Sequence, residues 1–157
     1  RVALFEPRIP QNTGTIGRSC LAFNLSLDII KPTGFSFDDK YLKRAGLDYW
    51  QNVDVHLYES FEDYRNKFIS SRFIALTKKS VNSISNIKYK NTDILLFGRE
   101  DTGLPEKIIN CCEVVAGIPM PGGENHFKSE GVRSLNLSVA CGIVSYSACQ
   151  QLNLLTN

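Results

Sequence analysis

The sequence predicts a single α/β domain over residues 1–157, with a mostly parallel sheet and helices on both of its faces. The 157 residues, 43% hydrophobic and 22% charged, have the length and composition of one globular domain. Short apolar segments rich in branched residues alternate with helical patterns along the chain, which is typical of a covered parallel sheet. The last helical pattern is apolar around most of its circumference, which indicates burial on more than one side.

Six short apolar segments are predicted to be strands, because each has the length and composition of a strand in a buried sheet. They span 2–6, 27–30, 53–58, 72–76, 93–98 and 114–118.

Five segments between or after these strands are predicted to be helices. Asn12 or Thr13 is the expected cap of the first helix, and Ser36 with Asp39 gives the start signal of the second. Pro105 suits the first turn of the short fourth helix. The predicted helices span 15–23, 36–46, 60–68, 105–110 and 135–152.

Charge and cysteine use exclude several classes of protein. Eighteen basic residues face sixteen acidic ones, so the whole surface is not a polycation, although a local basic patch remains compatible. Five cysteines without a CxxC pair, and two histidines without ligand spacing, favour reduced thiols and no metal site. No apolar run approaches the ~18 residues of a membrane helix, and no signal-peptide pattern opens the chain. We therefore expect a cytoplasmic protein without membrane or metal.

Unusual residues follow four of the predicted strands, at the edge of a parallel sheet where ligands bind. The first strand runs into PRIPQNTGTIGR, the fourth ends in ALTKK, the fifth runs into FGREDTGLP and the sixth into GIPMPGG. We expect these segments to line one pocket. Taken alone, FGREDTGLP is also explained by a strand–turn–helix connection with solvated charges, and Ser134, Asn136 and Ser138 near the last helix are also explained by helix capping.

The segment QNTGTIGR lies where a nucleotide-binding loop is often found, after a strand and before a helix. Gly14 and Gly17 do not complete the dinucleotide fingerprint, and Arg18 ends the segment, so dinucleotide binding is the weaker interpretation. GxSxG, HExxH and GxxxxGK[ST] motifs are absent from the sequence.

A basic cluster with neighbouring aromatic residues suits contacts to phosphates and stacking on bases, although on charge alone an ordinary solvated helix face is the better explanation. Its basic members share a helix face at i, i+3 and i+4 spacing. The cluster consists of Lys40, Lys43 and Arg44, with Tyr41, Tyr49 and Trp50 nearby. A thirteen-residue loop over 121–133, which contains Lys128, is long enough to suggest a function.

Three segments in order, NTGTIGR, LLFGREDTGLP and IPM…SLNLSVA, resemble the motifs of the SPOUT superfamily of AdoMet-dependent RNA 2′-O-ribose methyltransferases. ALFEPRIPQNTG and FSFDDKYLKRAGLDYW are similar to the small branch that methylates the wobble nucleotide, cytidine or uridine 34, of tRNA. The resemblance covers nearly the whole chain. It implies a C-terminal trefoil knot, S-adenosyl-L-methionine as cofactor, a homodimer and a tRNA substrate.

The resemblance also implies site residues. The catalytic residues would be Arg18, Asn12, Glu100, Ser134 and Asn136. The cofactor would contact Leu76, Gly98, Ile118, Met120, Ser134 and Leu135. RNA phosphates would contact Lys40, Lys43, Arg44 and Lys128. Because a guanidinium is essentially always protonated, we expect Arg18 to clamp a phosphate rather than to act as a general base.

Three other functions remain open at this point. One is the same chemistry directed at another tRNA position or at rRNA. A non-catalytic protein that binds RNA or AdoMet would keep the pocket without the reaction. A flavodoxin-like flavin-binding protein would share the fold class, and its yellow colour on purification would distinguish it.

Overall fold

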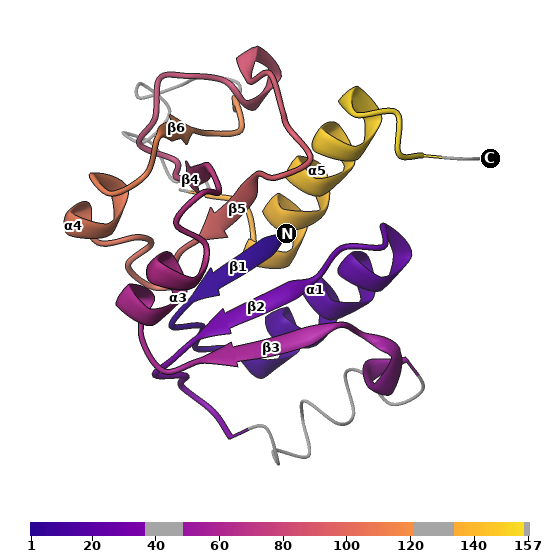
Figure 1. Cartoon of the computed structure of the whole chain (residues 1–157), viewed down its shortest axis with the longest axis vertical. Coiled ribbons are helices and arrows are strands. Elements are labelled where there is room, and N and C mark those ends of the chain that lie inside the picture. Colours follow the sequence, from indigo (N-terminus) through magenta and orange to yellow (C-terminus); the bar gives the residue numbers. More distant parts are fainter. Residues whose placement is uncertain (37–48, 121–133, 156–157) are drawn as a thin grey trace.

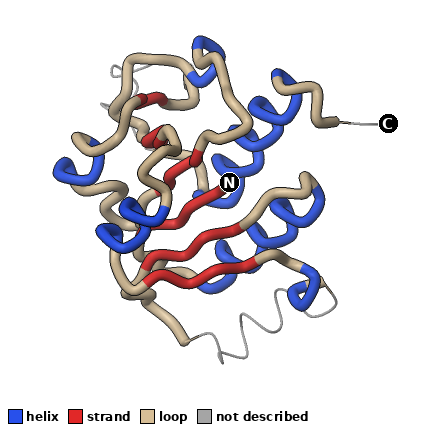
Figure 2. Tube along the Cα trace, in the orientation of Figure 1, coloured by secondary structure: helices blue, strands red, loops and turns tan. Residues whose placement is uncertain are grey.

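The computed structural model describes residues 1–36, 49–120 and 134–155. Six parallel strands form one sheet in the order β3-β2-β1-β5-β4-β6 (Figures 1 and 2). They are β1 Val2–Phe5, β2 Leu27–Ile30, β3 Val55–Tyr58, β4 Phe73–Leu76, β5 Ile94–Phe97 and β6 Val114–Ala116. The predicted parallel α/β sheet is therefore confirmed, with each predicted strand present and five of them one or two residues shorter.

In the part of the chain that the structure describes, four α-helices and two short 3-10 turns connect and cover the strands. The helices are α1 Pro10–Ala22, α3 Phe61–Lys67, α4 Glu106–Ile109 and α5 Leu137–Gln151, and the turns are η1 Trp50–Asn52 and η2 Ile84–Asn86. Apart from Ser36, the helix predicted over 36–46 lies outside the described residues.

The sheet is covered on both faces, as predicted. Successive residues of β1 point to opposite sides: Val2 and Leu4 pack with α1 and α5, whereas Ala3 and Phe5 pack with α3 and α4. All four side chains are buried. Figure 1 shows α1 and α5 on one side of the strands and α3 on the other. Because β1 lies between β2 and β5, the order of connection reverses beside β1, which is where such sheets bind ligands.

The first helix begins at Pro10, five residues earlier than predicted. Asn12 and Thr13 lie inside it, so the prediction that either caps the helix is wrong; the capping position is Ile9, whose side chain makes no cap hydrogen bond. Proline at the first helical position already has the required φ angle. Gly17 is tolerated inside the helix because a ring covers it: an added Cβ would lie 2.5 Å from Cζ3 of Trp50.

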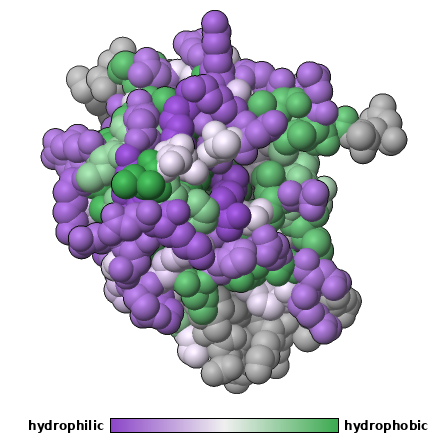
Figure 3. All heavy atoms as spheres, viewed as in Figure 1, coloured by the Kyte–Doolittle hydropathy of each residue, from purple (hydrophilic) through white to green (hydrophobic). Residues whose placement is uncertain are grey.

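The last helix is apolar on two sides, and the structure buries one of them. The helix starts at Leu137, directly after Asn136. Asn136 Oδ1 accepts a hydrogen bond of 2.8 Å from the Ser138 amide, so Asn136 caps the helix, as the capping interpretation of the sequence expects. One side of α5 is buried against the sheet and α1. The other exposes 40–49% of the surface of Val139, Ile143 and Tyr146. Figure 3 shows hydrophobic residues gathered along this side of the molecule, at the right of the view.

None of the helices in the described parts of the chain is long and apolar enough to cross a membrane.

Candidate active site

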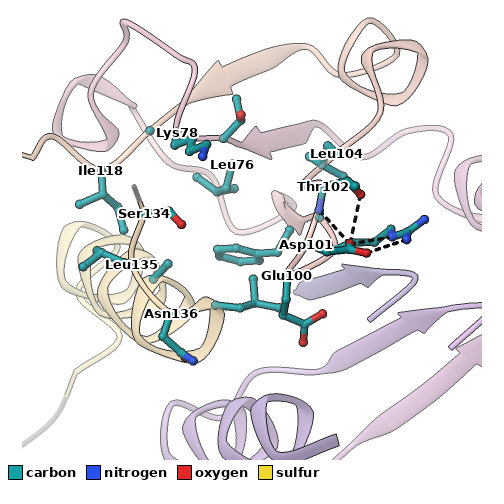
Figure 4. A pocket seen from close by; sticks show the side chains of 18 of the residues that line it. Leu76, Lys78, Glu100, Asp101, Thr102, Leu104, Ile118, Ser134, Leu135 and Asn136 are labelled. Carbon is teal, nitrogen blue, oxygen red and sulfur yellow. Dashed lines mark hydrogen bonds and ion pairs between the residues drawn. The ribbon is translucent and has the colours of Figure 1, made fainter. Parts of the chain in front are cut away.

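A cavity of about 640 Å³ opens at the carboxyl ends of β4, β5 and β6, beside the start of α1 and the start of α5 (Figure 4). All four predicted strand-end segments contribute to it, so their expected convergence is confirmed. The six residues predicted to contact a cofactor all line this cavity: Leu76, Gly98, Ile118, Met120, Ser134 and Leu135.

A tight turn after β5 forms one wall of the cavity. The Arg99 amide donates to the Gly103 carbonyl (3.2 Å) and the Gly103 amide to the Arg99 carbonyl (2.9 Å), with Gly103 at φ +73°. This turn folds back on Gly98 so closely that an added Cβ there would lie 2.2 Å from the carbonyl carbon of Gly103 and from the Leu104 nitrogen. Only glycine fits at position 98 without opening the turn.

The Glu100 carboxylate fastens this turn to the start of α1. Oε2 accepts from the Arg8 amide (2.8 Å), and Oε1 accepts from the Ile9 amide (3.2 Å) and from Asn12 Nδ2 (3.1 Å). A negative charge at a helix N-terminus is favourable because the first amides have no partner within the helix. In Figure 4 the carboxylate points away from Leu76 on the opposite wall of the cavity. Both oxygens of Glu100 therefore serve the backbone and Asn12.

Two asparagines extend this network to the last helix. Asn136 Nδ2 donates to Asn12 Oδ1 (3.0 Å), while Asn136 Oδ1 accepts from the Ser138 amide (2.8 Å) and hydroxyl (2.7 Å). Asn12 is only 6% exposed, and both the nitrogen and the oxygen of its side-chain amide have a hydrogen-bond partner. One connected set of hydrogen bonds thus joins Glu100, Asn12 and Asn136, which lie far apart in the sequence.

Arg18 is the one predicted catalytic residue that does not line the cavity. It lies on the exposed side of α1, six residues or about 9 Å along the helix from Asn12. Its guanidinium lies over the Tyr49 ring, 4.5 Å from the ring centroid.

The described residues contain six arginines, and Arg18 is the exception among them because it has no carboxylate partner. The other five pair as Arg1–Asp28, Arg8–Glu6, Arg65–Glu113, Arg72–Asp93 and Arg99–Asp101. Within the described residues, the Arg18 guanidinium thus contacts an aromatic ring instead of a carboxylate.

An ion pair stiffens the rim of the cavity. Arg99 donates from Nε (3.0 Å) and Nη2 (2.9 Å) to the two oxygens of Asp101, and the Thr102 amide donates to the same carboxylate (2.8 Å). These hydrogen bonds lower the pKa of Asp101 to about 2, and those from Arg99 make the largest contribution. Arg99 also lies 3.6 Å from Glu6, so it ties the turn to the end of β1.

Two lysines in the cavity wall were not among the predicted site residues. Lys78 and Lys79 follow β4, and neither forms an ion pair within the parts of the chain that the structure describes. Their position directly after a strand was the available signal. The predicted RNA contacts, by contrast, lie outside the described residues: Lys40, Lys43, Arg44 and Lys128.

The chemistry of the cavity is that of a binding site with fixed polar groups. Within residues 1–36, 49–120 and 134–155, no group of three His, Cys, Asp or Glu side chains could hold a metal ion. The buried cysteines behave as thiols; burial raises the pKa of Cys141 to about 12. The arrangement is suited to holding an organic ligand beside a polar network.

Known proteins share this sequence and fold. A sequence profile of the SpoU rRNA Methylase family matches residues 1–146. The tRNA (cytidine(34)-2'-O)-methyltransferase of Escherichia coli (strain K12) is 40% identical over 154 residues, which are 96% of this chain and 92% of that protein.

Two solved structures superpose closely. One is described as giving structural insights into the 2-OH methylation of C/U34 on tRNA. It has a TM-score of 0.88 at 38% identity, and the match covers 97% of this chain and 95% of the chain in that structure. An AdoMet-bound rRNA methyltransferase from Sinorhizobium meliloti has a TM-score of 0.83 at 26% identity, over 99% of this chain and 56% of its own. The resemblance seen in the sequence is thus confirmed, and the chain belongs to the SpoU rRNA methylase family.

Proposed function

We propose that the protein transfers a methyl group from S-adenosyl-L-methionine to the ribose 2′-OH of the wobble nucleotide, position 34, of tRNA. Family membership supports the reaction type, and the relatives named for cytidine 34 and for C/U34 support the position. The observation that carries the proposal is the cavity itself. It joins all three motif segments at one sheet edge and ties them together through Glu100, Asn12 and Asn136.

The cavity fits a cofactor of this size and chemistry. Its volume of about 640 Å³ falls within the ~300–1,000 Å³ of small-molecule sites. Leu76, Ile118 and Leu135 offer apolar surface for an adenine ring, while Lys78 in the wall offers a cation for a carboxylate. Bound AdoMet would supply an electrophilic methyl group on a sulfonium. The residues proposed to hold it are Leu76, Gly98, Ile118, Met120, Ser134 and Leu135.

Positioning dominates the proposed reaction. The ribose 2′-oxygen would attack the methyl carbon of AdoMet in line: a C–O bond forms, the S–C bond breaks to leave the thioether S-adenosylhomocysteine, and the hydroxyl proton passes to water. We assign Asn12, Ser134 and Asn136 to the wall beside the reacting groups. We assign Glu100 an indirect role: both of its oxygens accept hydrogen bonds from Asn12 and the start of α1, so it positions Asn12 rather than contacting the reacting groups.

Arg18 is proposed to bind the phosphate next to the reacting ribose and to stabilise the negative charge that develops on the 2′-oxygen. Its guanidinium has no acidic partner in the described residues. Arg18→Lys should lower turnover, because an ammonium cannot donate two parallel bonds to a phosphate. Near-normal turnover with a shifted pH–rate profile would point instead to a general base.

We propose a homodimer that uses the exposed apolar side of α5. Val139, Ile143 and Tyr146 form a stripe there, and the Tyr146 ring packs against Phe23 of the chain after α1 (centroids 6.4 Å apart). An apolar stripe of this kind suits association with a second copy. The C-terminal trefoil knot is also a proposal. It is supported by the contact of the segment after β6 with the loop after β4, where the Gly117 amide donates to the Asn82 carbonyl (2.8 Å).

The basic side chains outside the described residues, Lys40, Lys43, Arg44 and Lys128, are proposed to grip the tRNA backbone. We propose that the protein acts in the cytoplasm on this substrate.

The experiment is methyl transfer from labelled AdoMet to bulk RNA, followed by mapping of the 2′-O-methyl groups. The proposal expects label in tRNA at nucleotide 34. Label at another tRNA position or in rRNA would agree with the proposed reaction type but would contradict nucleotide 34 of tRNA as the substrate. AdoMet or RNA binding with no transfer to any RNA would mark a non-catalytic binding protein.

A further inference from the structure

The side of α1 that carries Arg18 is built around two aromatic residues. The Tyr49 hydroxyl donates to the Gly14 carbonyl (3.2 Å), and the Tyr49 ring lies under the Arg18 guanidinium. Gly14 and Arg18 are four residues apart and therefore lie on the same face of the helix. One ring thus spans this face, with its hydroxyl end fixed to the backbone and its flat side against the cation.

The next residue along the chain also packs on α1. Trp50 packs on Gly17 so closely that any side chain at position 17 would collide with it. Tyr49 and Trp50 are both half-buried, and both belong to the hydrophobic cluster between the sheet and α1. Tyr49 therefore presents its ring to Arg18 from a segment that packs against the core.

We propose that Tyr49 is a positioning residue for Arg18: its ring holds the guanidinium flat so that the N–H edges face an RNA phosphate. This inference rests on the proposed role of Arg18 at the substrate. Stacking uses the face of the guanidinium, whereas all five N–H groups lie in its plane. An arginine held in this way keeps its bidentate donors free, which an ion pair with a carboxylate does not.

The five other described arginines show the contrast. Each is engaged by a carboxylate, and Arg1, for example, gives both Nε and Nη2 to Asp28 (2.6 and 2.7 Å). Only at Arg18, within the described residues, does an aromatic ring take the place of the acidic partner. A phosphate that approaches Arg18 therefore displaces no carboxylate of residues 1–36, 49–120 or 134–155.

The experiment is a double-mutant cycle between Tyr49→Leu and Arg18→Gln, with Tyr49→Phe as the conservative variant. Single-turnover methyl transfer and the affinity for a tRNA anticodon stem-loop are both measured. Tyr49→Leu should lower the rate and the RNA affinity by about threefold to tenfold, the range of a partly exposed cation–π contact. In the Arg18→Gln background the same change should have an effect of less than about twofold. Tyr49→Phe should recover most of the loss, since the ring remains.

The matched control is Phe68→Leu, which removes a half-buried ring under Arg1 (5.0 Å) on the opposite side of the sheet. It should lower the melting temperature without lowering either readout at a temperature where the variant is folded. Equal effects of Tyr49→Leu in both backgrounds, or an equal loss in Tyr49→Phe, would overturn the inference. The wild-type protein could bind the stem-loop and yet transfer no methyl group, while the stem-loop affinities of the four proteins remain non-additive. That result would overturn the proposed function and leave this inference standing.

Discussion

Replacement of Glu100 by alanine tests whether this carboxylate holds the cavity together. The change removes the acceptor of three hydrogen bonds, from the amides of Arg8 and Ile9 and from Asn12 Nδ2. Asn12 is nearly buried, so its amide cannot find water without a local rearrangement. The damage should begin at the start of α1 and spread to Asn136 through its bond with Asn12.

The magnitude follows from the exposure of the three donors. A hydrogen bond to a charged group contributes about 1.5–3 kcal/mol when it is well buried. Here the bond from Ile9 is exposed and the other two are partly buried, so we expect a total loss of about 2–3 kcal/mol rather than the full sum. In a domain of this length that corresponds to a fall in Tm of about 4–12 °C. Glu100→Gln should retain part of the stability, because one amide oxygen still accepts.

Thermal unfolding followed by circular dichroism measures the effect. Glu59→Gln is the matched control, since Glu59 is 77% exposed and makes a surface ion pair of 2.7 Å with Lys31. That variant should shift Tm by no more than about 2 °C. A Glu100→Ala protein that melts within 2 °C of the wild type, about the same small shift as the control, would refute the anchoring role.

Three further predictions concern the cavity wall, its rim and the exposed helix face. Gly98→Ala should weaken AdoMet binding in calorimetry and destabilise the protein by about 1–3 kcal/mol, because the new Cβ meets backbone. The control Gly142→Ala, where an added Cβ meets nothing within 4 Å, should be neutral or slightly stabilising; equal losses in both would contradict this account. Asp101 should titrate near pH 2 by NMR and move toward its ordinary 3.8 in Arg99→Gln. Since the pKa of Asp101 is lower in the folded than in the unfolded protein, the ionised Asp101 stabilises the fold above about pH 4, and this contribution is lost as the pH falls through about 2. An unchanged titration midpoint of Asp101 in Arg99→Gln would show that the ion pair does not cause the low pKa. Ile143→Glu should convert the proposed dimer to monomers in sedimentation equilibrium, and a dimer of unchanged stability would place the interface elsewhere.

The start of α1 shows why one helix boundary was mispredicted from sequence. QNTG reads locally as a turn, because asparagine and glycine favour turns. In the folded chain it is helical from Pro10, because Glu100 supplies acceptors at the helix start and Trp50 covers Gly17. Both contacts come from segments distant in sequence, so no local pattern contains them.

The position of the candidate site was predictable, whereas its internal connections were not. Parallel strands put their carboxyl ends on one edge, and the motifs after β1, β4, β5 and β6 therefore converge. The order of the strands, the Glu100–Asn12–Asn136 network and the stacking of Arg18 on Tyr49 depend on tertiary packing. These features appear only once the sheet is assembled.

The most direct test of the central claim is to incubate the purified protein with unmodified tRNA and methyl-labelled AdoMet, and to locate the label by nucleotide. The account predicts one 2′-O-methyl group per accepted tRNA, on the ribose of nucleotide 34, and a large loss of that signal in Arg18→Gln. Label at a base, label on another nucleotide, or full activity in Arg18→Gln would contradict it.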